Sequence, residues 1–308
     1  MKAIVITKQG PPEALQLQEV EKPKPEENEI LVRVHAATVT RGDVILRKLH
    51  PLMYIPMQIM GIKRKKTPGH EFAGEVVEVG KNVTKFKVGD KVFGTTTGLS
   101  VGANAEYICL PESWRSGIIA NMPANATYEE AAALPVGGMT ALDILKRGNI
   151  KSHQKVLING ASGSVGSYAV QIAKHYFNAD VTGVCSTKNI PVVQSLGAGQ
   201  VIDYTKEDFT QSNQSYDVIF DAVGKISAAE AKKTLNKGGA FLTVKTTTKE
   251  TKEDLDILVS LFETGKLKAV IDSRYPLAQV ADAHRKVETG HKVGNIIISV
   301  IPDKVEGV

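Results

Sequence analysis

The chain has 308 residues, which suits two domains of ordinary size, and its 42% apolar and 23% charged residues are the proportions of a globular enzyme with a sizeable core. The net charge of +5 excludes the dense basic clustering of a nucleic-acid binder, so we expect no nucleic-acid partner. The two cysteines, Cys109 and Cys185, cannot build a disulfide framework or a multi-cysteine zinc loop. The first ten residues turn polar too early for a signal peptide and every apolar run is too short to span a bilayer, so we expect a cytoplasmic protein.

Residues 1–122 have the pattern of an all-β domain. Five β-branched runs, each broken by Gly, Pro, Asn or Asp, predict strands at KAIVIT, EILVRVHAATV, FAGEVVEVG, DKVFGTT and NAEYICL. We expect these strands to form a small barrel or a rolled sheet.

Between residues 123 and 274 helices alternate with strands. Thr127 with two acids after it marks the start of a helix, and MTALDILKRG continues helically. The strands that follow are KVLING, DVTGVCS, QVIDY, YDVIFDAVG and GGAFLTV, and the helices are SVGSYAVQIAKHY, NIPVVQSLG, SAAEAKKTLN and KEDLDILVSLFETG. This alternation predicts an α/β fold with a doubly wound parallel sheet and helices on both of its faces.

The tail contains a strand, AVIDSRYP, a helix, LAQVADAHRKVETG, and a last strand, NIIISVI. A lone terminal strand needs a sheet to pair with, and the parallel sheet is already complete without it. We therefore expect the last helix and strand, within residues 275–308, to rejoin the N-terminal β domain.

A glycine-rich turn joins the first strand of the parallel sheet to its helix, in KVLINGASGSVGSYAVQIA (155–173). Ala161, at the first position of the dinucleotide fingerprint, would make the tight turn. Gly163 would leave room for the pyrophosphate, and Gly166 would let the helix pack closely on the strand. The alternative is a glycine-rich turn that binds nothing. The segment that we expect to bind the phosphates is Ala161, Ser162, Gly163, Ser164, Val165 and Gly166.

The residues after the second strand of this sheet indicate whether the cofactor is NADH or NADPH. An NAD enzyme has Asp or Glu there, to bind the ribose hydroxyls. This chain has Ser186, Thr187, Lys188 and Asn189, and Asp180 lies at the opposite end of the strand. Hydroxyls and an ammonium bind a 2′-phosphate that a carboxylate would repel, so we expect NADPH as the cofactor. The alternative for Lys188 is a solvated surface lysine.

These segments together resemble the medium-chain dehydrogenase/reductase superfamily, and within it the zinc-free quinone oxidoreductases of the zeta-crystallin group. The resemblance covers nearly the whole chain and includes VHAATVTRGD, PGHEFAGEVVEVGKNVTKFKVGDKVFG, AALPVGGMTALDIL, GASGSVG, SLGAGQVIDYTKEDF and YDVIFDAVG in family order. It implies a GroES-like β domain made of residues 1–122 and 275–308, a Rossmann domain at 123–274, and a cofactor in the cleft between them. It also implies a homodimer that pairs edge strands of the Rossmann sheet, for which AVIDSRYP is a candidate.

The resemblance assigns further cofactor contacts residue by residue. Ser186 and Lys188 correspond to the 2′-phosphate site, and Tyr204 corresponds to a tyrosine that lines the same pocket. Thr140 lies where the chain passes the cofactor. Gly294-Asn295 departs from the Gly-Lys that many relatives have near the C-terminus. The residues of the segments that flank the nicotinamide are Ala222, Val223, Gly224, Thr243 and Val244.

His70, in PGHEFAGEV, bears on whether the chain binds zinc. In the zinc-dependent branch of the superfamily two cysteines join the histidine of this motif, and here the corresponding positions hold Thr40 and Val136. One imidazole with Glu71 beside it cannot close a tetrahedral site, so we expect no metal. We interpret His70 as a buried, hydrogen-bonded residue or, alternatively, as a polar group near the substrate. Thr40, where relatives commonly have asparagine, is a catalytic-site candidate that would contact nicotinamide or substrate.

The absence of zinc that we expect limits the class of substrate that the site can reduce. A simple ketone needs a Lewis acid or a proton donor for its alkoxide, whereas a quinone or an α,β-unsaturated carbonyl spreads the incoming charge over its own conjugated system. We therefore expect hydride transfer from NADPH to an apolar acceptor of that class. The Met- and Leu-rich segment 46–66 could line the substrate slot, with Tyr54 stacking on a flat ring, or it could be a packed insertion or a partner-facing patch. The alternative functions are a zinc-dependent alcohol dehydrogenase and a non-catalytic NADPH-binding interaction protein.

Overall fold

The computed structural model describes residues 1–53 and 65–301, and the chain divides into two compact units. The β unit consists of Met1–Val136 and Ile271–Val308, and the parallel-sheet unit consists of Gly137–Val270. The second unit is thus inserted into the sequence of the first, in an α/β fold with a β-rich domain.

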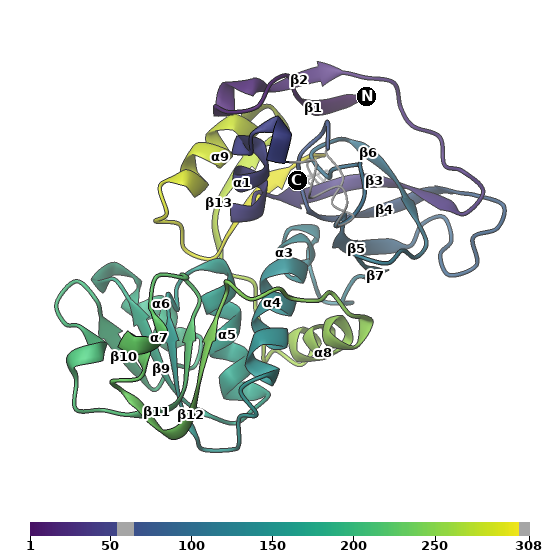
Figure 1. Ribbon diagram of the computed structural model, residues 1–308. Coiled ribbons are helices and arrows are strands. Elements are labelled where there is room, and N and C mark those ends of the chain that lie inside the picture. The colour runs from purple at the N-terminus through teal and green to yellow at the C-terminus, as the bar shows by residue number, and fades with distance from the viewer. Residues whose placement is uncertain (54–64, 302–308) are drawn as a thin grey trace, which may run out of the picture. The chain divides into compact units, whose positions relative to one another are not determined.

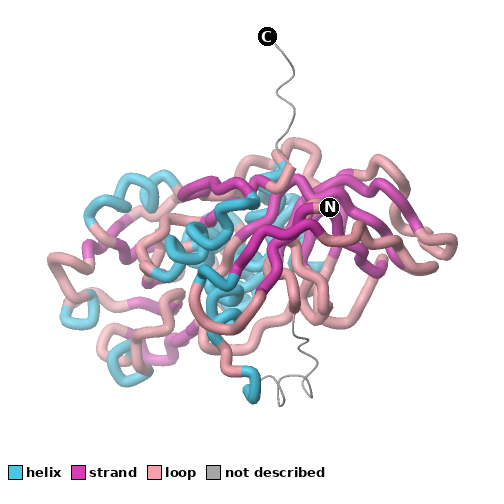
Figure 2. The backbone as a smooth tube through the Cα atoms, turned by 90° about the horizontal axis from the view of Figure 1, so that it is seen from above, coloured by secondary structure: helices cyan, strands magenta, loops and turns pink. Residues whose placement is uncertain are grey.

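Among the described residues of the β unit, strands outnumber helices, and Figure 2 draws strands in magenta and helices in cyan. β1 and β2 make a small antiparallel sheet, and a larger sheet has the order β13-β14-β3-β4-β5-β7, with β6 also paired to β3. All five strands expected in the N-terminal region are present, and β2 and β7 are additional. The bounds are β1 Lys2–Ile6, β2 Leu15–Glu19, β3 Glu29–Thr38, β4 Glu71–Val79, β5 Lys91–Thr95, β6 Tyr107–Pro111, β7 Ile119–Asn121, β13 Ile271–Pro276 and β14 Asn295–Ser299.

The C-terminal strands complete the larger sheet. β14 pairs antiparallel with β3, with Ile297 opposite Thr38, which confirms that the last strand returns to the N-terminal domain. β13 pairs with the other edge of β14 in parallel, with Arg274 opposite Ile297. The assignment of AVIDSRYP to an edge of the Rossmann sheet is therefore wrong, because β14 offers this strand a free edge within the β unit.

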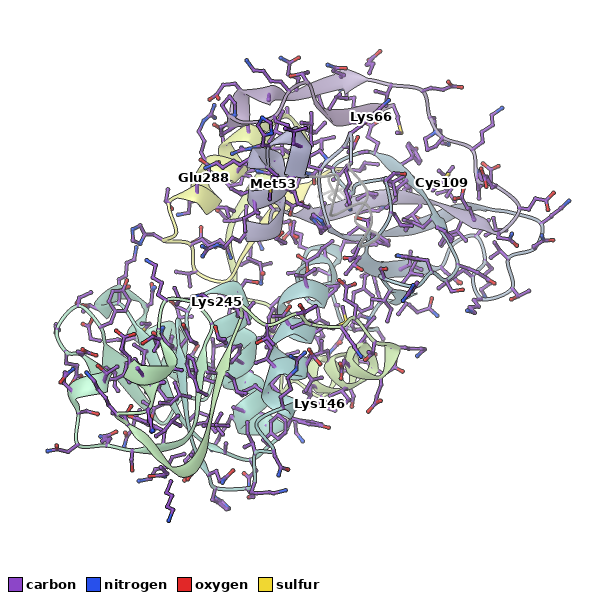
Figure 3. The ribbon with its side chains drawn as sticks, viewed as in Figure 1. Met53, Lys66, Cys109, Lys146, Lys245 and Glu288 are labelled. Carbon is purple, nitrogen blue, oxygen red and sulfur yellow. The ribbon has the colours of Figure 1, made fainter. Side chains whose placement is uncertain are left out.

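In the described part of the β unit, helices α3 and α9 pack on strands, and α1 packs on α9. α3 lies against β3, β4 and β14, so the unit continues past residue 122. α9 lies against α1, and Figure 3 shows Glu288 on α9 beside that helix. The core beneath them includes Val32, Phe72, Ile296 and Ile298, all without solvent exposure. The bounds are α1 Arg41–Lys48, α3 Tyr128–Ala133 and α9 Val280–Glu288, with 3-10 turns at Pro12–Ala14, Pro51–Met53 and Leu277–Gln279.

The inserted unit contains a five-stranded, wholly parallel sheet with the order β10-β9-β8-β11-β12. Numbered from its first strand this order is 3-2-1-4-5, the doubly wound arrangement that alternation predicted. β10 and β12 are its edges. The bounds are β8 Lys155–Asn159, β9 Asp180–Cys185, β10 Gln200–Asp203, β11 Tyr216–Asp221, β12 Leu235–Thr243, α4 Pro135–Lys146, α5 Ser164–His175, α6 Ile190–Ser195, α7 Ala228–Ala231 and α8 Lys252–Glu263, with 3-10 turns at Thr187–Asn189 and Phe209–Gln211.

Two elements of this unit differ from the sequence pattern. The helix expected at SAAEAKKTLN is the single turn α7, and β12 begins at Leu235, before the expected GGAFLTV. Leu235 pairs with Tyr216 on β11 and packs in a cluster that includes Ile219 and Ala231. Sheet pairing and burial thus override a helical pattern at this point.

α4 and α5 lie side by side next to the parallel sheet (Figure 1). A Cβ added at Gly137 on α4 would stand 2.7 Å from Ser164 Oγ and 3.0 Å from the Tyr168 ring, both on α5. The glycine therefore sets the close approach of the two helices. Within residues 1–53 and 65–301, no helix combines the length and the apolar character needed to cross a bilayer.

Candidate functional site

The carboxyl ends of the parallel strands meet at one edge of the sheet, which we call the strand-end edge. The register puts Asn159, the last residue of β8, opposite Val184 on β9 and Asp221 on β11. It also puts Cys185 opposite Asp203 on β10. Nearly all the cofactor contacts expected in this unit follow directly after these strand ends. In a doubly wound sheet this edge is where nucleotides bind.

The turn after β8 is made by Gly160 rather than by Ala161. Gly160 has φ +77°, in the left-handed region, and its Cβ would stand 2.5 Å from Val223 Cγ2. Ala161 is buried, and its backbone N–H donates to Val184 O at 3.0 Å. The fingerprint assignment is thus corrected by one residue, because only glycine adopts this backbone conformation without strain.

Gly163 and Gly166 are glycines for different reasons. A Cβ at Gly166 would stand 2.0 Å from Gly160 O, so close packing of α5 on the turn requires glycine. A Cβ at Gly163, the N-cap of α5, would approach only Gly160 O, at 3.4 Å, which is ordinary contact. The protein itself therefore has room for a Cβ at Gly163. Its absence leaves the start of α5, with Ser164 and Val165, open to an anion that the N–H groups of the first turn can bind.

The end of β9 carries the polar residues expected for a 2′-phosphate. Ser186 is the N-cap of the turn Thr187–Asn189, and Lys188 on it is exposed, with no ion pair to any described residue. Tyr204 is 56% exposed, and its N–H donates to Cys185 O at 3.1 Å. Ser186, Lys188 and Tyr204 thus gather around the ends of β9 and β10.

A carboxylate, Asp203, also lies at this edge, and sequence reasoning missed it. Its Oδ2 accepts from Thr187 Oγ1, and its Oδ1 accepts from the N–H and the Oγ1 of Thr205, at 3.0 and 2.7 Å. The bond from Thr187 and the bonds from Thr205 hold the pKa of Asp203 at about 2, against a smaller opposing effect of burial. The signal that could have found it is the repeated spacing of Asp203-x-Thr205 and Asp208-x-Thr210.

The segments expected beside the nicotinamide lie at the ends of β11 and β12. Asp221 organises the first of them: its Oδ1 accepts from the N–H groups of Val223 and Gly224, both at 3.0 Å. Gly224 has φ +77°, and a Cβ added to it would stand 3.5 Å from Val244 Cγ2. The partly exposed residues of both segments are Ala222, Val223, Gly224, Thr243 and Val244.

Thr140 lies on α4, three residues after Gly137, and its side chain is partly exposed. Gly137 brings this stretch of α4 against Ser164 at the start of α5. Thr140 is therefore on the helix that neighbours the phosphate turn, while Tyr54 lies outside the described residues.

Thr40 and His70 share one partner in the β unit, the buried carboxylate Asp43. Thr40 caps α1: its Oγ1 and N–H donate to Asp43 Oδ2 at 2.6 and 2.8 Å, and its Oγ1 accepts from Asp43 N–H at 3.1 Å. Asp43 Oδ1 lies 2.6 Å from His70 Nδ1 and accepts from Gly69 N–H at 3.1 Å. Burial alone would raise the pKa of Asp43, but the His70 charge and hydrogen bonds from His70 and Thr40 lower it well below its usual range. Asp43 thus fixes the orientation of both candidates.

The His70 side chain is 17% exposed. Its Nε2 has no hydrogen-bond partner among the described residues and is not enclosed by protein. His70 is therefore hydrogen-bonded, as the first interpretation held, but only partly buried; its role near a substrate stays a prediction.

Glu71 is committed to the framework of the β unit. It accepts from Thr38 Oγ1, and its Oε1 accepts from Val136 N–H at 2.7 Å. Lys292, which the sequence did not single out, lies near Glu71 and Asp272 and donates to Gly294 O. Burial lowers the pKa of Lys292 to about 8, and the two carboxylates oppose this shift.

The residues around His70 differ from the ligand set of the zinc-dependent branch. The two positions of the zinc-dependent cysteines hold Thr40, whose hydroxyl is bonded to Asp43, and the apolar Val136. Across residues 1–53 and 65–301, no three His, Cys, Asp or Glu side chains gather as metal ligands. Cys109 and Cys185 are buried in strands of different units, and burial raises their thiol pKa values to about 12 and about 11.

Two family models match the chain. One is described as an alcohol dehydrogenase GroES-like domain and matches residues 26–124. The other is described as a zinc-binding dehydrogenase and matches residues 196–252 and 242–298. The first falls in the β unit, and the second spans the end of the parallel-sheet unit and the return to the β unit.

Curated relatives and solved structures match over nearly the full length. A chloroplast envelope quinone oxidoreductase homolog from Arabidopsis thaliana is 33% identical over 91% of this chain and 92% of its own. An NADPH-dependent alkenal/one oxidoreductase, chloroplastic, from the same organism is 31% identical over 98% of this chain and 80% of its own. The structure of the quinone oxidoreductase from Coxiella burnetii has 28% identity and a TM-score of 0.83, covering 98% of this chain and 99% of that chain.

A β unit that carries an inserted doubly wound sheet, with a glycine turn of the dinucleotide-binding type, is the architecture of a dehydrogenase or reductase. The chain belongs to the medium-chain dehydrogenase/reductase superfamily, in its quinone oxidoreductase-like group. It is accordingly an oxidoreductase. The expected fold, a GroES-like β domain with an inserted Rossmann sheet, is confirmed.

Proposed function

We propose that the protein transfers a hydride from NADPH to a quinone or an α,β-unsaturated carbonyl compound, without a zinc ion. The observation that carries this proposal is the strand-end edge, where the open turn at Gly163 is followed on the next strand by Lys188, a cation with no described partner. The names of the two Arabidopsis relatives, an alkenal/one oxidoreductase and a quinone oxidoreductase homolog, support the same class of acceptor.

The chain's own residues would hold NADPH along this edge. The N–H groups at the start of α5 suit the pyrophosphate, because the side of Gly163 is open and the helix dipole favours an anion there. Ser186, Lys188 and Tyr204 suit a 2′-phosphate. The carboxylate that could bind ribose hydroxyls instead, Asp203, is buried and already accepts three hydrogen bonds. This arrangement favours NADPH over NADH.

When bound, NADPH supplies the hydride equivalent. A conjugated acceptor takes it up and then needs one proton, which water can supply. In the β unit Thr40 serves to hold Asp43, since its hydroxyl proton is already donated to that carboxylate. His70 Nε2 has no hydrogen-bond partner among the described residues, so it is the polar atom that we propose contacts the substrate. The positions where zinc-dependent relatives have cysteine hold Thr40 and Val136, which supports a reaction without zinc.

The reaction is tested by mixing the purified protein with NADPH and 9,10-phenanthrenequinone, with and without a chelator, and following nicotinamide absorbance. We expect oxidation of NADPH that the chelator does not change. Dependence on metal would instead support a zinc-dependent alcohol dehydrogenase. NADPH binding without any oxidation would support a non-catalytic interaction protein.

The cofactor choice is tested with Lys188→Glu, which sets a carboxylate against the 2′-phosphate. We expect the KM for NADPH to rise at least about tenfold while the KM for NADH stays within about twofold, because only NADPH carries that phosphate. An equal change in both values would contradict the assignment of NADPH.

We also propose a homodimer and a cytoplasmic location. The free edges available for pairing parallel sheets are β10 and β12, not β13. The two Arabidopsis relatives are chloroplast proteins by name, so the location needs its own test by cell fractionation. Light scattering at micromolar concentration tests the dimer.

A further inference from the structure

We propose that Asp203 is a specificity-positioning residue, which holds the 2′-phosphate loops in place through a hydrogen-bonded network across three strand ends. The network consists of two sets of hydrogen bonds, one from Asn189 to Ser162 and one among Thr187, Asp203 and Thr205, which the backbone of the turn Thr187–Asn189 joins; together we call them the strand-end network. The inference rests on the proposed use of NADPH. It explains why this chain places a carboxylate close to a site that must bind a dianion.

The strand-end network begins at the phosphate turn. Asn189 Nδ2 donates to Ser162 Oγ at 3.0 Å, which ties the loop after β9 to the loop after β8. Within the loop after β9, Asn189 N–H donates to Ser186 O at 2.9 Å, so the loop is closed on itself. Lys188 lies between these anchored residues and is itself exposed.

The network then passes to the loop after β10. Thr187 Oγ1 donates to Asp203 Oδ2, and the Oγ1 atoms of Thr187 and Thr205 are 3.2 Å apart. Asp203 Oδ1 accepts twice from Thr205. Tyr204 lies between these two residues, and its N–H donates to Cys185 O. One carboxylate therefore fixes the loop that carries Lys188 and the loop that carries Tyr204.

Asp203 is not available to a ribose. Its side chain is 7% exposed, and hydroxyl or amide donors take both of its oxygens. The exposed Lys206 lies 3.6 Å from Oδ2 and partly balances its charge. In NAD enzymes an acid near this edge binds ribose hydroxyls directly. In this chain the carboxylate of Asp203 bonds to Thr187 and Thr205 instead. It therefore affects the cofactor site by positioning the two loops rather than by contacting the cofactor.

The test removes one bond at a time from the intact protein. Thr187→Val keeps the size of the side chain and deletes the donor to Asp203. We expect the KM and the Kd for NADPH to rise about tenfold, the size of effect expected from one hydrogen bond to a charged group. The same constants for NADH should stay within about twofold, and kcat at saturating NADPH should not change. Thr187→Ser, which keeps the hydroxyl, should restore NADPH affinity.

The matched control is Thr210→Val. Thr210 donates to Asp208 in the same Asp-x-Thr arrangement, with bonds of 2.9 Å, but in the 3-10 turn before β11. This variant should match the wild type for both cofactors.

Two results would overturn the inference. If Thr187→Val weakens NADPH and NADH equally, the network only stabilises the fold; if it weakens neither, the loops do not need it. A wild-type protein that does not distinguish the two cofactors would instead remove the proposed NADPH function, and the inference with it.

Discussion

Gly163 and Gly166 lie three residues apart, but the atoms around them show that they are glycines for different reasons. Gly166 is fixed by the protein, since a Cβ there would meet Gly160 O at 2.0 Å. Gly163 has room for a Cβ and an extended backbone that any residue adopts, with φ −77° and ψ 177°. A glycine that the fold does not need indicates a ligand that comes close to the backbone.

Gly163→Val should therefore keep the fold and lose the cofactor. We expect a melting temperature within a few degrees of the wild type, but no rise in that temperature when NADPH is added, because the side chain fills the space of the pyrophosphate. Gly166→Ala should instead lower the melting temperature of the protein alone, since its Cβ forces α5 off the turn. Thermal melts with and without NADPH check both variants, and an undiminished NADPH shift in Gly163→Val would contradict this account of the turn.

At the scale of elements, α1 and α9 bury charged groups where they meet. Arg47 on α1 is fully buried and pairs with Glu288 on α9. His284 on α9 is fully buried, and neither of its ring nitrogens has a partner among the described residues. Burial lowers its pKa to about 4; Asp43 opposes this shift, Arg47 adds to it, and Glu288 opposes it. His284 is thus neutral in the folded protein at neutral pH.

This neutral histidine predicts a pH dependence of stability. Its folded pKa lies below the value of 6.5 expected when unfolded, so the unfolded chain binds the proton first. The stability is complete above pH 6.5 and falls between about pH 6.5 and pH 4, by about 3 kcal/mol for a shift of this size. Denaturant melts across that range should show the fall, and His284→Leu should remove it. The exposed His291→Leu is the control; a fall of the same size in His284→Leu would show that another group is responsible.

Sequence reasoning succeeded for elements whose cause is local. The capping box of Thr127 and Glu130 is readable from spacing alone and starts α3 where expected. The strand, turn and helix around Gly163 were predicted for the same reason. Sequence reasoning failed where the register between strands determines which residues meet. Asp203 bonds to Thr187 because it lies opposite Cys185 on the neighbouring strand. AVIDSRYP reads correctly as a strand, but no local pattern says which sheet will accept it.

For the whole molecule, the interrupted β unit sets an order of assembly. β3 pairs with β4 and β6 from its own part of the chain, but its residues 36–38 pair with β14, and among the described strands β13 pairs with β14 alone. The intervening residues 137–270 contain every strand of the parallel sheet. During synthesis the inserted unit can therefore fold as soon as it emerges, whereas the nascent chain upstream of it holds an unpaired edge. The β unit is thus complete only once β14 has been made, and until then the edge of β3 at residues 36–38 has no strand beside it.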